Sequence, residues 1–356
     1  AAFEENIRAE LRDNLLRIRH HACLGLLCGN NEMELGWVGW EDVVTHHPAL
    51  KADYIKMFEY VISQEAQINA PDVFYWPSSP SSGGSFDDPN AENRGDVHYW
   101  DVWHRMKPFT DYEKFYFRFC SEFGFESFPG RKTIETFTEP SDRNIFSPVM
   151  ESHQKNGAAN GLIMFYISSY YRYPKDFDSL LYISQLLQAE AMRHGVEHWR
   201  RNRGRCMGAI YWQLNDCWPV ASWASIDYFG RWKALHYYAR RFFSPRMVTA
   251  KAEDAKLRMW VHNDSRTALE GTVEVELRDT AYGLLAHMEV PVQVPPLSVT
   301  ELDAVDFMQE LAERGQDTVF VAYRLCEKNN TGAYASTLFC RPKQMELPRP
   351  NYTVHV

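Results

Sequence analysis

The stretch Cys23–Glu32, CLGLLCGNNE, decides the fold that we expect for this chain. Its first seven residues form a short run that is wholly apolar. They follow Phe3–Arg19, where apolar residues recur at helical spacing among many charges. A buried strand with no alternating polar face is typical of a parallel sheet that is covered on both sides. The stretch therefore predicts an α/β arrangement, with a strand that ends on polar residues and a carboxylate.

The same succession of helix and strand recurs along the first two thirds of the chain. We expect helices at about 50–68, near 111–115 and at about 179–201, and further strands at 73–76, 97–103, 117–124 and 207–216. Repeated βα units with polar residues just after the strands are typical of a TIM (β/α)8 barrel. Five such strands can be counted, so we expect an incomplete barrel that holds about strands 4–8.

The pattern changes at about residue 244. From there short runs such as TVFVAYRL and YASTLFC alternate with turn residues, at the spacing of a β-sandwich. The fold class that we predict is therefore α/β followed by all-β. Residues 1–244 would form the C-terminal part of the barrel, and residues 245–356 an immunoglobulin-like β-sandwich.

Charge and composition exclude several classes of partner. The 356 residues carry a formal net charge of -9 and no basic stripe, so neither nucleic acid nor an anionic membrane surface is expected to bind. No run of 18 apolar residues is present, so we expect no membrane span. The seven scattered cysteines include no Cys-x-x-Cys pair and favour a reducing, cytoplasmic compartment. Neither a cofactor nor a metal is expected, and the oligomeric state stays open.

Two carboxylates stand at the ends of predicted strands. Glu32 follows the first strand directly, and Glu122 lies within FCSEFGF near the end of a later one. Hydrolysis of a glycosidic bond requires two carboxyl groups that flank one anomeric carbon. The two residues are 90 positions apart (122 minus 32), which fits three βα units of roughly 30 residues each. Strands three apart face one another across a barrel mouth, so the two groups can converge there.

The neighbouring residues strengthen this interpretation, although 47 acidic residues leave a chance coincidence open. Asn31, beside Glu32, offers amide hydrogen bonds for a sugar hydroxyl. Aromatic side chains crowd the same strand ends, and their flat faces suit the C–H surfaces of pyranose rings. Aromatic residues also fill barrel cores, and we expect more than half of these to do so.

Five motifs, in order and covering about residues 20–243, resemble those of the β-mannosidases of glycoside hydrolase family 2. They are GLLCGNNEMELGW, YWPSSPSSGG, GDVHYWDVW, SEFGFESFP and YWQLNDCWPVASWASIDYFGRWKALHYYARRFF. The resemblance implies a retaining exo-glycosidase that removes terminal β-D-mannosyl residues through a covalent glycosyl-enzyme. By that resemblance Glu32 is the general acid/base and Glu122 is the nucleophile. Glu32 must then be protonated near neutral pH while Glu122 stays ionised.

The resemblance also implies a set of substrate-binding residues. Asn31 would hydrogen-bond the sugar 2-hydroxyl, a contact that strengthens as the anomeric carbon flattens. Trp212 would lie under the sugar ring as a platform. His98, Trp100 and Trp103 would line the pocket.

The departures from the family pattern concern the parts that this chain does not hold. Family members carry β-sandwich domains before the barrel, and one of these domains helps to close the sugar pocket. We therefore expect the chain to need missing N-terminal domains of the same enzyme and to be inactive alone. Other family 2 specificities stay open, namely β-galactosidase, β-glucuronidase and exo-glucosaminidase, as does a non-catalytic carbohydrate-binding fragment.

Three further signals carry less weight. Glu34 and Glu126 are neighbours that could be mistaken for the catalytic pair, but each lies beyond its strand end. The pattern His194-Gly-Val-Glu197-His198 matches a zinc-binding motif, but five-residue patterns occur by chance. The loop that follows Pro77, rich in Ser, Gly and Pro, is expected to border the pocket.

Overall fold

The computed structural model describes residues 2–40, 48–328 and 330–349. The chain divides into two compact units, each assembled from separate stretches of sequence. Unit 1 holds residues 1–101, 113–123 and 204–211, and unit 2 holds residues 102–112, 124–203 and 212–356.

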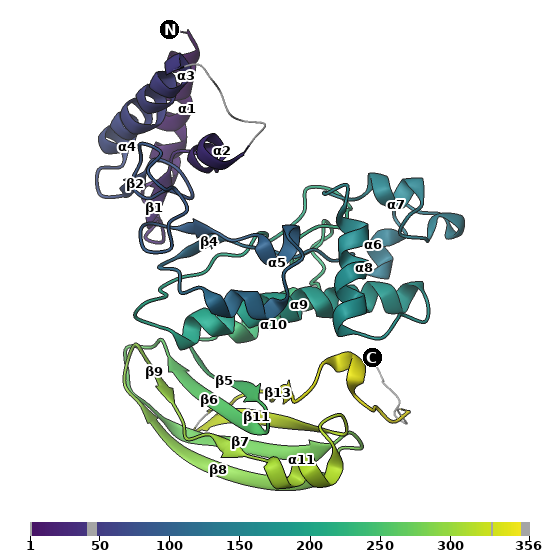
Figure 1. Ribbon diagram of the computed structural model, residues 1–356. Coiled ribbons are helices and arrows are strands. Elements are labelled where there is room, and N and C mark those ends of the chain that lie inside the picture. The colour runs from purple at the N-terminus through teal and green to yellow at the C-terminus, as the bar shows by residue number, and fades with distance from the viewer. Residues whose placement is uncertain (1, 41–47, 329, 350–356) are drawn as a thin grey trace. The chain divides into compact units, whose positions relative to one another are not determined.

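Unit 1 combines helices with short parallel strands (Figure 1). Its helices are α1 (Ala2–Ile18), α2 (Met33–Gly39), α3 (Pro48–Tyr54) and α4 (Ile62–Asn69), with a π-helical turn at Ile55–Val61 between the last two. Its strands are β1 (Leu26–Cys28), β2 (Phe74–Trp76), β3 (Val97–His98) and β4 (Cys120–Glu122). Helices α1 and α4 pack together, and Arg8 on α1 binds Glu65 on α4 at 2.9 Å.

The pairing of these strands is parallel throughout. Strand β1 pairs with β2, and β3 pairs with β4. A bridge from Cys120 to Ala209 adds a parallel contact with the segment that begins at Gly204. Four of the five predicted strands are thus confirmed as strands, whereas 207–216 forms isolated bridges. The strand predicted at 97–103 ends at His98, because Asp101–His104 form the short helix α5.

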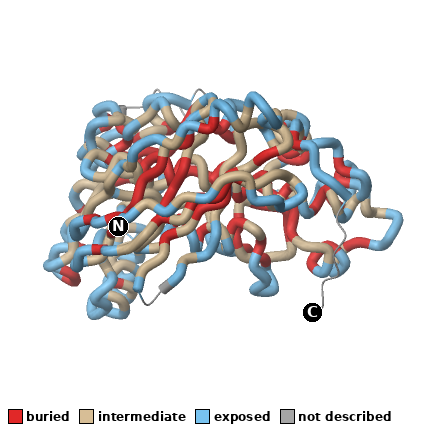
Figure 2. Tube along the Cα trace, turned by 90° about the horizontal axis from the view of Figure 1, so that it is seen from below, coloured by how far each residue is buried: buried red, intermediate tan, exposed pale blue. Residues whose placement is uncertain are grey.

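Unit 2 begins with helices. They are α6 (Arg131–Ile134), α7 (Pro148–Ser152), α8 (Ala159–Tyr170), α9 (Phe177–Arg201) and α10 (Ala234–Phe242), and 3-10 turns lie at Phe109–Lys114 and Pro140–Asp142. The side chain of Asp176 caps α9 by accepting a hydrogen bond from the Ser179 N–H at 2.7 Å. The buried face of α9 includes Leu187 and Val196, both fully buried. Figure 2 colours the buried stretches of the chain red and the exposed ones pale blue.

The C-terminal part of unit 2 is a sandwich of two antiparallel sheets. Its elements are β5 (Arg246–Glu253), β6 (Lys256–Asn263), β7 (Leu269–Asp279), β8 (Leu284–Val294), β9 (Ser298–Glu301), β10 (Val305–Asp306), α11 (Met308–Arg314), β11 (Val319–Glu327), β12 (Asn330–Thr331) and β13 (Ala335–Leu338). One sheet has the order β10-β6-β5 with β9 on β6, and the other has the order β12-β11-β7-β8 with β13 on β11. The sandwich that the alternating pattern predicts is therefore present.

Alternate residues of the sandwich strands point into one common core. On β7, Val273, Val275 and Leu277 are fully buried, and on β6 Met259 and Val261 are also fully buried. They belong to the same hydrophobic cluster. The two-residue period arises because successive side chains of a strand point to opposite faces.

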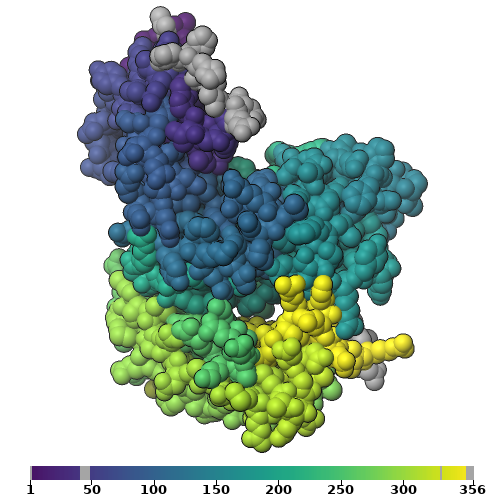
Figure 3. Space-filling model, in the orientation of Figure 1, coloured from purple at the N-terminus to yellow at the C-terminus, as the bar shows by residue number. Residues whose placement is uncertain are grey.

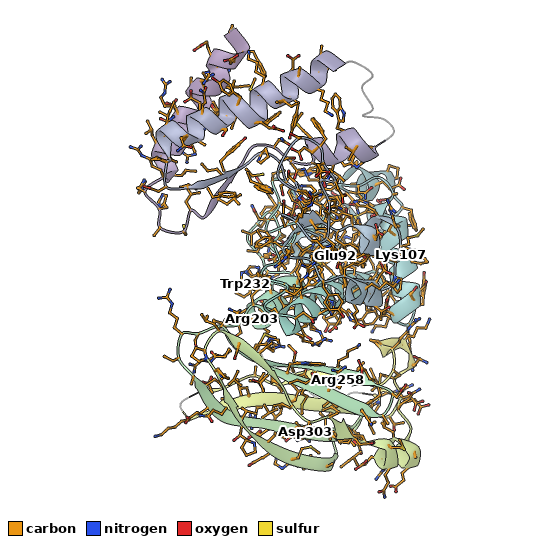
Figure 4. All side chains as sticks on the ribbon, turned by 60° about the vertical axis from the view of Figure 1, so that its left-hand side comes forward. Glu92, Lys107, Arg203, Trp232, Arg258 and Asp303 are labelled. Carbon is orange, nitrogen blue, oxygen red and sulfur yellow. The ribbon has the colours of Figure 1, made fainter. Side chains whose placement is uncertain are left out.

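Arginines at the end of α9 attach the helix to the sandwich within unit 2. Arg200 donates to the Asp264 carboxylate at 2.7 Å, and Arg203 donates to the other oxygen of the same group. Arg201 lies over the ring of Trp260, with its guanidinium carbon 4.9 Å from the ring centroid. Figure 4 labels Arg203 at this junction. The predicted domain boundary after residue 244 stays a prediction, although the first sandwich strand begins two residues later.

The C-terminal segment after β13 returns to the helices of unit 2. Arg172 donates to the Met345 carbonyl at 2.7 Å, and Lys343 donates to the Ser168 carbonyl at 2.8 Å. Figure 3 shows this yellow segment against the teal helical region. Among the helices that the structure describes, none combines the length and the apolar character required to cross a bilayer.

The sandwich core gives a first test. Truncation of the fully buried Leu277 to Ala should lower the free energy of unfolding by about 2–4 kcal/mol, because it removes apolar contacts and leaves a cavity. Leu284, which is 53% exposed, is the control, and Leu284→Ala should cost less than about 0.5 kcal/mol. Urea denaturation followed by circular dichroism measures both changes. Equal losses for the two variants would contradict the assignment of this core.

Candidate active site

The turn after β1 places Glu32 through backbone hydrogen bonds. The Glu32 N–H donates to the Ser79 carbonyl at 2.7 Å, and the Ser79 N–H donates to the Asn30 carbonyl at 2.9 Å. The side chain of Asn30 joins the same two segments, since it donates to the Pro77 carbonyl and accepts from the Ser78 hydroxyl. Glu32 has φ 58°, a left-handed conformation that is uncommon for a residue other than glycine. These hydrogen bonds hold it in that conformation.

Strand pairing places the second carboxylate. Glu122 is the last residue of β4 and lies in register with His98 on the parallel strand β3. The Tyr99 N–H donates to the Glu122 carbonyl at 2.8 Å. The Asn90 side chain holds the backbone of His98 from both sides: it accepts from the N–H at 2.9 Å and donates to the carbonyl at 3.1 Å.

The imidazole of His98 lies beside both carboxylates. Its Nδ1 is 2.7 Å from Oε1 of Glu32 and 3.5 Å from Oε2 of Glu122. The side chain of His98 is 2% exposed, against 16% for Glu32 and 14% for Glu122. One ligand atom from each residue falls within 4.8 Å of the other two. Unit 1 thus brings together both predicted catalytic residues, on one partly buried patch.

The electrostatic environment of Glu122 raises its pKa. Burial is the main cause, and the negative charge of Glu32 adds to it. The nearby His98 and a hydrogen bond from Trp100 act in the opposite direction, because both stabilise the carboxylate.

The predicted binding residues fall into different environments. Asn31 pairs through its backbone with Ser79 and exposes its side chain, and Trp100 contacts Glu122 directly. Trp103 is fully buried and packs on Phe125 at a centroid distance of 4.7 Å. A buried ring offers no face to a sugar, so Trp103 belongs to the core and not to the pocket lining. Trp212 lies in unit 2 with 43% of its surface exposed, and its role as a platform stays a prediction.

Sequence reasoning missed three polar residues that surround His98. The Ser79 hydroxyl is 2.9 Å from Nε2 of His98 and donates to the Asp96 carboxylate at 2.6 Å. Ser121 donates to the same oxygen of Asp96 at 2.6 Å. Ser79 lies in the loop that we expected to border the pocket, and Asp96 directly precedes β3. The available signal was their place within the quoted motifs, which gave no reason to single out these side chains.

Comparisons with known proteins find β-mannosidases among the relatives of this chain. A protein named Beta-mannosidase B from Aspergillus fumigatus is 34% identical over 307 residues, which cover 79% of this chain and 36% of that protein. The Beta-mannosidase B of Aspergillus terreus is 32% identical over 341 residues and covers 87% of the chain. Over most of its own length the chain is therefore similar to the β-mannosidases of glycoside hydrolase family 2. It spans 36–40% of the length of these two curated relatives.

Solved structures and a family model show a similarity too. The crystal structure of a β-D-mannosidase from Dictyoglomus thermophilum matches with a TM-score of 0.87 and 28% identity, over 98% of this chain and 42% of that one. An exo-chitosanase from Amycolatopsis orientalis matches over 95% of this chain and 39% of that one, with a TM-score of 0.70 and 14% identity, and so shares the fold. Residues 255–344 match the model of the Mannosidase Ig/CBM-like domain.

The two carboxylates that neighbour the predicted pair, Glu34 and Glu126, are structural. Glu34 is fully buried and accepts hydrogen bonds from the hydroxyls of Tyr54 and Ser81, both at 2.8 Å. Glu126 in unit 2 is fully buried too, and burial raises its pKa well above the ordinary value. Lys233 and Gln154 oppose that shift. Neither carboxylate has the partial exposure that a reacting group needs.

The zinc-motif residues on α9 do not form a metal site. Glu197 is bound by Arg201 at 2.9 Å and lies 3.7 Å from Arg193. Within the described residues, the group with metal-ligand spacing is that of Glu32, His98 and Glu122. There Nδ1 of His98 and the Glu32 oxygen contact each other directly at 2.7 Å, a hydrogen-bond distance.

A separate cavity of about 460 Å3 lies in unit 2, between α9, α10 and the sandwich. Its charged side chains are largely neutralised by pairing, since Arg193 binds Glu190 and Arg246 binds Glu327. Three tyrosines, Tyr237, Tyr238 and Tyr334, also line it. The cavity lacks an adjacent pair of partly exposed carboxylates and offers no chemistry for hydrolysis.

The buried Lys233 of unit 2 gives a test of the pH dependence of stability. Its amino group donates to the carbonyls of Ser127 and Ser222. Burial lowers the pKa of Lys233 to about 8 from its ordinary 10.5, while the charges of Asp216 and Glu126 oppose the shift. Between these two pH values the unfolded chain binds a proton that the folded chain does not. Stability from this group therefore rises with pH across the window and is lost as pH falls through about 8.

We expect Lys233→Met to remove this rise of stability with pH. Between pH 8 and 10.5 the free energy of unfolding of the unsubstituted chain should rise relative to the variant, by an amount on the order of 1–3 kcal/mol. Urea denaturation of both proteins at matched pH values measures the difference, and other titrating groups cancel in it. Parallel profiles for the two proteins would show that Lys233 keeps an ordinary pKa.

Proposed function

We propose that this chain carries the catalytic pair of a retaining exo-β-mannosidase, with Glu32 as general acid/base and Glu122 as nucleophile. The observation that supports the proposal most directly is the separation of the two carboxylates, whose nearest oxygens lie within 4.8 Å. Retaining glycosidases keep the two groups about 5–5.5 Å apart, whereas inverting ones leave about 6.5–9.5 Å for a water molecule. The shorter distance favours direct attack by Glu122.

The reaction then has two steps. In the first, a Glu122 oxygen bonds to the anomeric carbon while the bond to the leaving oxygen breaks. Glu32 transfers its proton to that oxygen. In the second, Glu32 as a carboxylate takes a proton from water, and the water oxygen replaces Glu122 on the anomeric carbon. The sugar leaves with its original anomeric configuration because it is inverted twice.

The surroundings of the pair suit these roles. Burial raises the pKa of Glu122, and the hydrogen bond from Trp100 opposes this by favouring the ionised form, which must carry its charge in order to attack. The exposed side chain of Asn31, adjacent to Glu32, is available for the sugar 2-hydroxyl. Mannosides differ from glucosides at that carbon, so Asn31 is the residue to which we assign this contact.

The substrate follows from the names of the relatives. Proteins from two Aspergillus species are named Beta-mannosidase B, and a Dictyoglomus structure is titled a β-D-mannosidase. A β-mannoside is therefore the substrate that we propose. Aryl β-glycosides that differ at C2 or C4 separate it from the other specificities of the family.

The architecture that we propose is an incomplete (β/α)8 barrel over residues 1–244, followed by the sandwich. Strands β1 to β4 and the segment 207–216 would be its last five strands, about strands 4–8. The parallel pairs and the parallel bridge at Ala209 support this order. The exposure of Leu26 and Phe74, 49% and 58%, is consistent with a further barrel portion packing on β1 and β2.

The nucleophile is tested by a matched pair of substitutions in the longest natural protein that contains this chain. Glu122→Gln should lower turnover of an aryl β-mannoside by roughly 10³-fold or more, because an amide cannot attack the anomeric carbon. Glu126→Gln is the control, since this carboxyl lies close to Glu122 in the sequence but is fully buried. The control should keep most of its turnover. Comparable activity in both variants would contradict the assignment.

A second test concerns the chain by itself. The 356 residues span 36% of the length of the Aspergillus fumigatus relative, so we expect them to lack part of the sugar pocket. Alone, they should release no more 4-nitrophenol from 4-nitrophenyl β-mannoside than the uncatalysed reaction does. Turnover close to that of the longest natural protein would show that these residues hold a complete site.

A further inference from the structure

We propose that Ser79 and Asp96 are positioning residues, which fix the tautomer of His98 so that its Nδ1 presents a lone pair to Glu32. This inference rests on the proposed role of Glu32 as acid/base and extends it. The hydrogen bonds run in one line from Asp96 through the Ser79 hydroxyl to Nε2, and from Nδ1 to Glu32. None of these three residues is a general acid or a nucleophile itself.

Asp96 is the fixed end of this line. One of its oxygens accepts the hydroxyls of Ser79 and Ser121, both at 2.6 Å. The other accepts the Ser81 N–H at 3.0 Å and the indole N–H of Trp76 at 3.2 Å. A carboxylate that accepts four donors holds each of them in one direction.

The hydroxyl of Ser79 transmits that direction to the ring. A serine hydroxyl has one proton, and the short contact to Asp96 uses it. The contact from Ser79 to Ser121 is longer, 3.3 Å, and the Ser121 proton also goes to Asp96. What Ser79 presents to His98 at 2.9 Å is therefore a lone pair, so Nε2 must carry the hydrogen.

The consequence appears at the opposite nitrogen. With the hydrogen on Nε2, a neutral imidazole has only a lone pair at Nδ1, and it accepts a hydrogen bond from the carboxylic acid form of Glu32 at 2.7 Å. When Glu32 has given its proton to the leaving oxygen, the resulting carboxylate faces the Nδ1 lone pair, and the attacking water returns a proton to Glu32 in the second step. The charged groups around the ring are Glu32, Glu122 and, through Ser79, Asp96. The ring therefore favours the acid form of Glu32, with which each turnover begins.

The alternative tautomer would act differently. A hydrogen fixed on Nδ1 of a neutral ring would oppose the acid form of Glu32 and favour its carboxylate. Glu32 would then protonate the leaving group less well. Loss of the Ser79 hydroxyl should therefore slow the reactions that depend on acid assistance, and spare those whose leaving group departs unprotonated.

The test compares leaving groups in the longest natural protein that contains this chain. The value of kcat/KM is measured for phenyl β-mannoside, which needs a proton, and for 2,4-dinitrophenyl β-mannoside, which does not. Ser79→Ala should lower the phenyl value by about tenfold to a hundredfold, a part of the ~10²–10⁴-fold contribution of a general acid. It should change the dinitrophenyl value by less than about threefold. Ser79→Thr, which keeps the hydroxyl, should restore the wild-type ratio.

Ser121→Ala is the matched control, because the Ser121 hydroxyl donates to the same Asp96 oxygen, whereas Ser79 is the hydroxyl that lies 2.9 Å from Nε2 of His98. It should leave the ratio of the two rates at the wild-type value. Equal losses on both substrates in Ser79→Ala, or the same ratio change in Ser121→Ala, would overturn the proposal. Should Ser79→Ala not fold, Ser79→Cys keeps the volume with a weaker acceptor and should shift the ratio in the same direction.

Glu32→Ala separates this inference from the proposed function. If Glu32 is the acid, Glu32→Ala must itself lose far more activity on the phenyl than on the dinitrophenyl substrate. Equal losses on both substrates for Glu32→Ala would overturn the proposed function and, with it, the positioning role of Ser79 and Asp96. A strong leaving-group dependence in Glu32→Ala, with none in Ser79→Ala, would overturn the positioning role alone.

Discussion

The contact between the imidazole of His98 and the carboxyl of Glu32 is the interaction on which unit 1 depends. Two carboxyl groups within 4.8 Å of each other repel when both are ionised, and partial burial strengthens that repulsion. The proposed acid form of Glu32 carries no charge and so avoids that repulsion, and it donates a hydrogen bond to Nδ1 of His98 at 2.7 Å. Parallel pairing of β3 with β4 places His98 beside Glu122, and the turn after β1 brings in Glu32.

Much of the local structure serves to hold that arrangement. Glu32 adopts a left-handed backbone conformation that costs of order 1–3 kcal/mol and persists when its surroundings determine it. Here the surroundings are the backbone hydrogen bonds to Ser79 and the side chain of Asn30. The side chain of Asn90 holds the backbone of His98 in the same way, through hydrogen bonds to its N–H and carbonyl. Reacting groups held in this way need little rearrangement during catalysis.

The sequence predicted those features that depend on local pattern. Apolar runs located β1, β2, β3 and β4, and alternating residues located most of the sandwich strands. Strand-end position and motif order singled out Glu32 and Glu122, which the structure brings together.

Other features depend on more than local pattern. The helix α8 was not predicted, because its sequence is mostly apolar and shows no clear polar face. Trp103 was misplaced in the pocket, since a motif identifies a residue but not the direction of its ring. Ser79 and Asp96 escaped notice because their role depends on hydrogen bonds between residues distant in sequence.

The most direct measurement of the central claim is the identification of the covalently modified residue. The longest natural protein that contains this chain would be treated with 2-deoxy-2-fluoro-β-mannosyl fluoride, whose fluorine slows the second step, and then digested for mass spectrometry. The account predicts one added sugar, on the Glu122 carboxylate, and its slow release with return of activity. A sugar attached to Glu126 or to another residue, or turnover with inversion and no attachment, would contradict it.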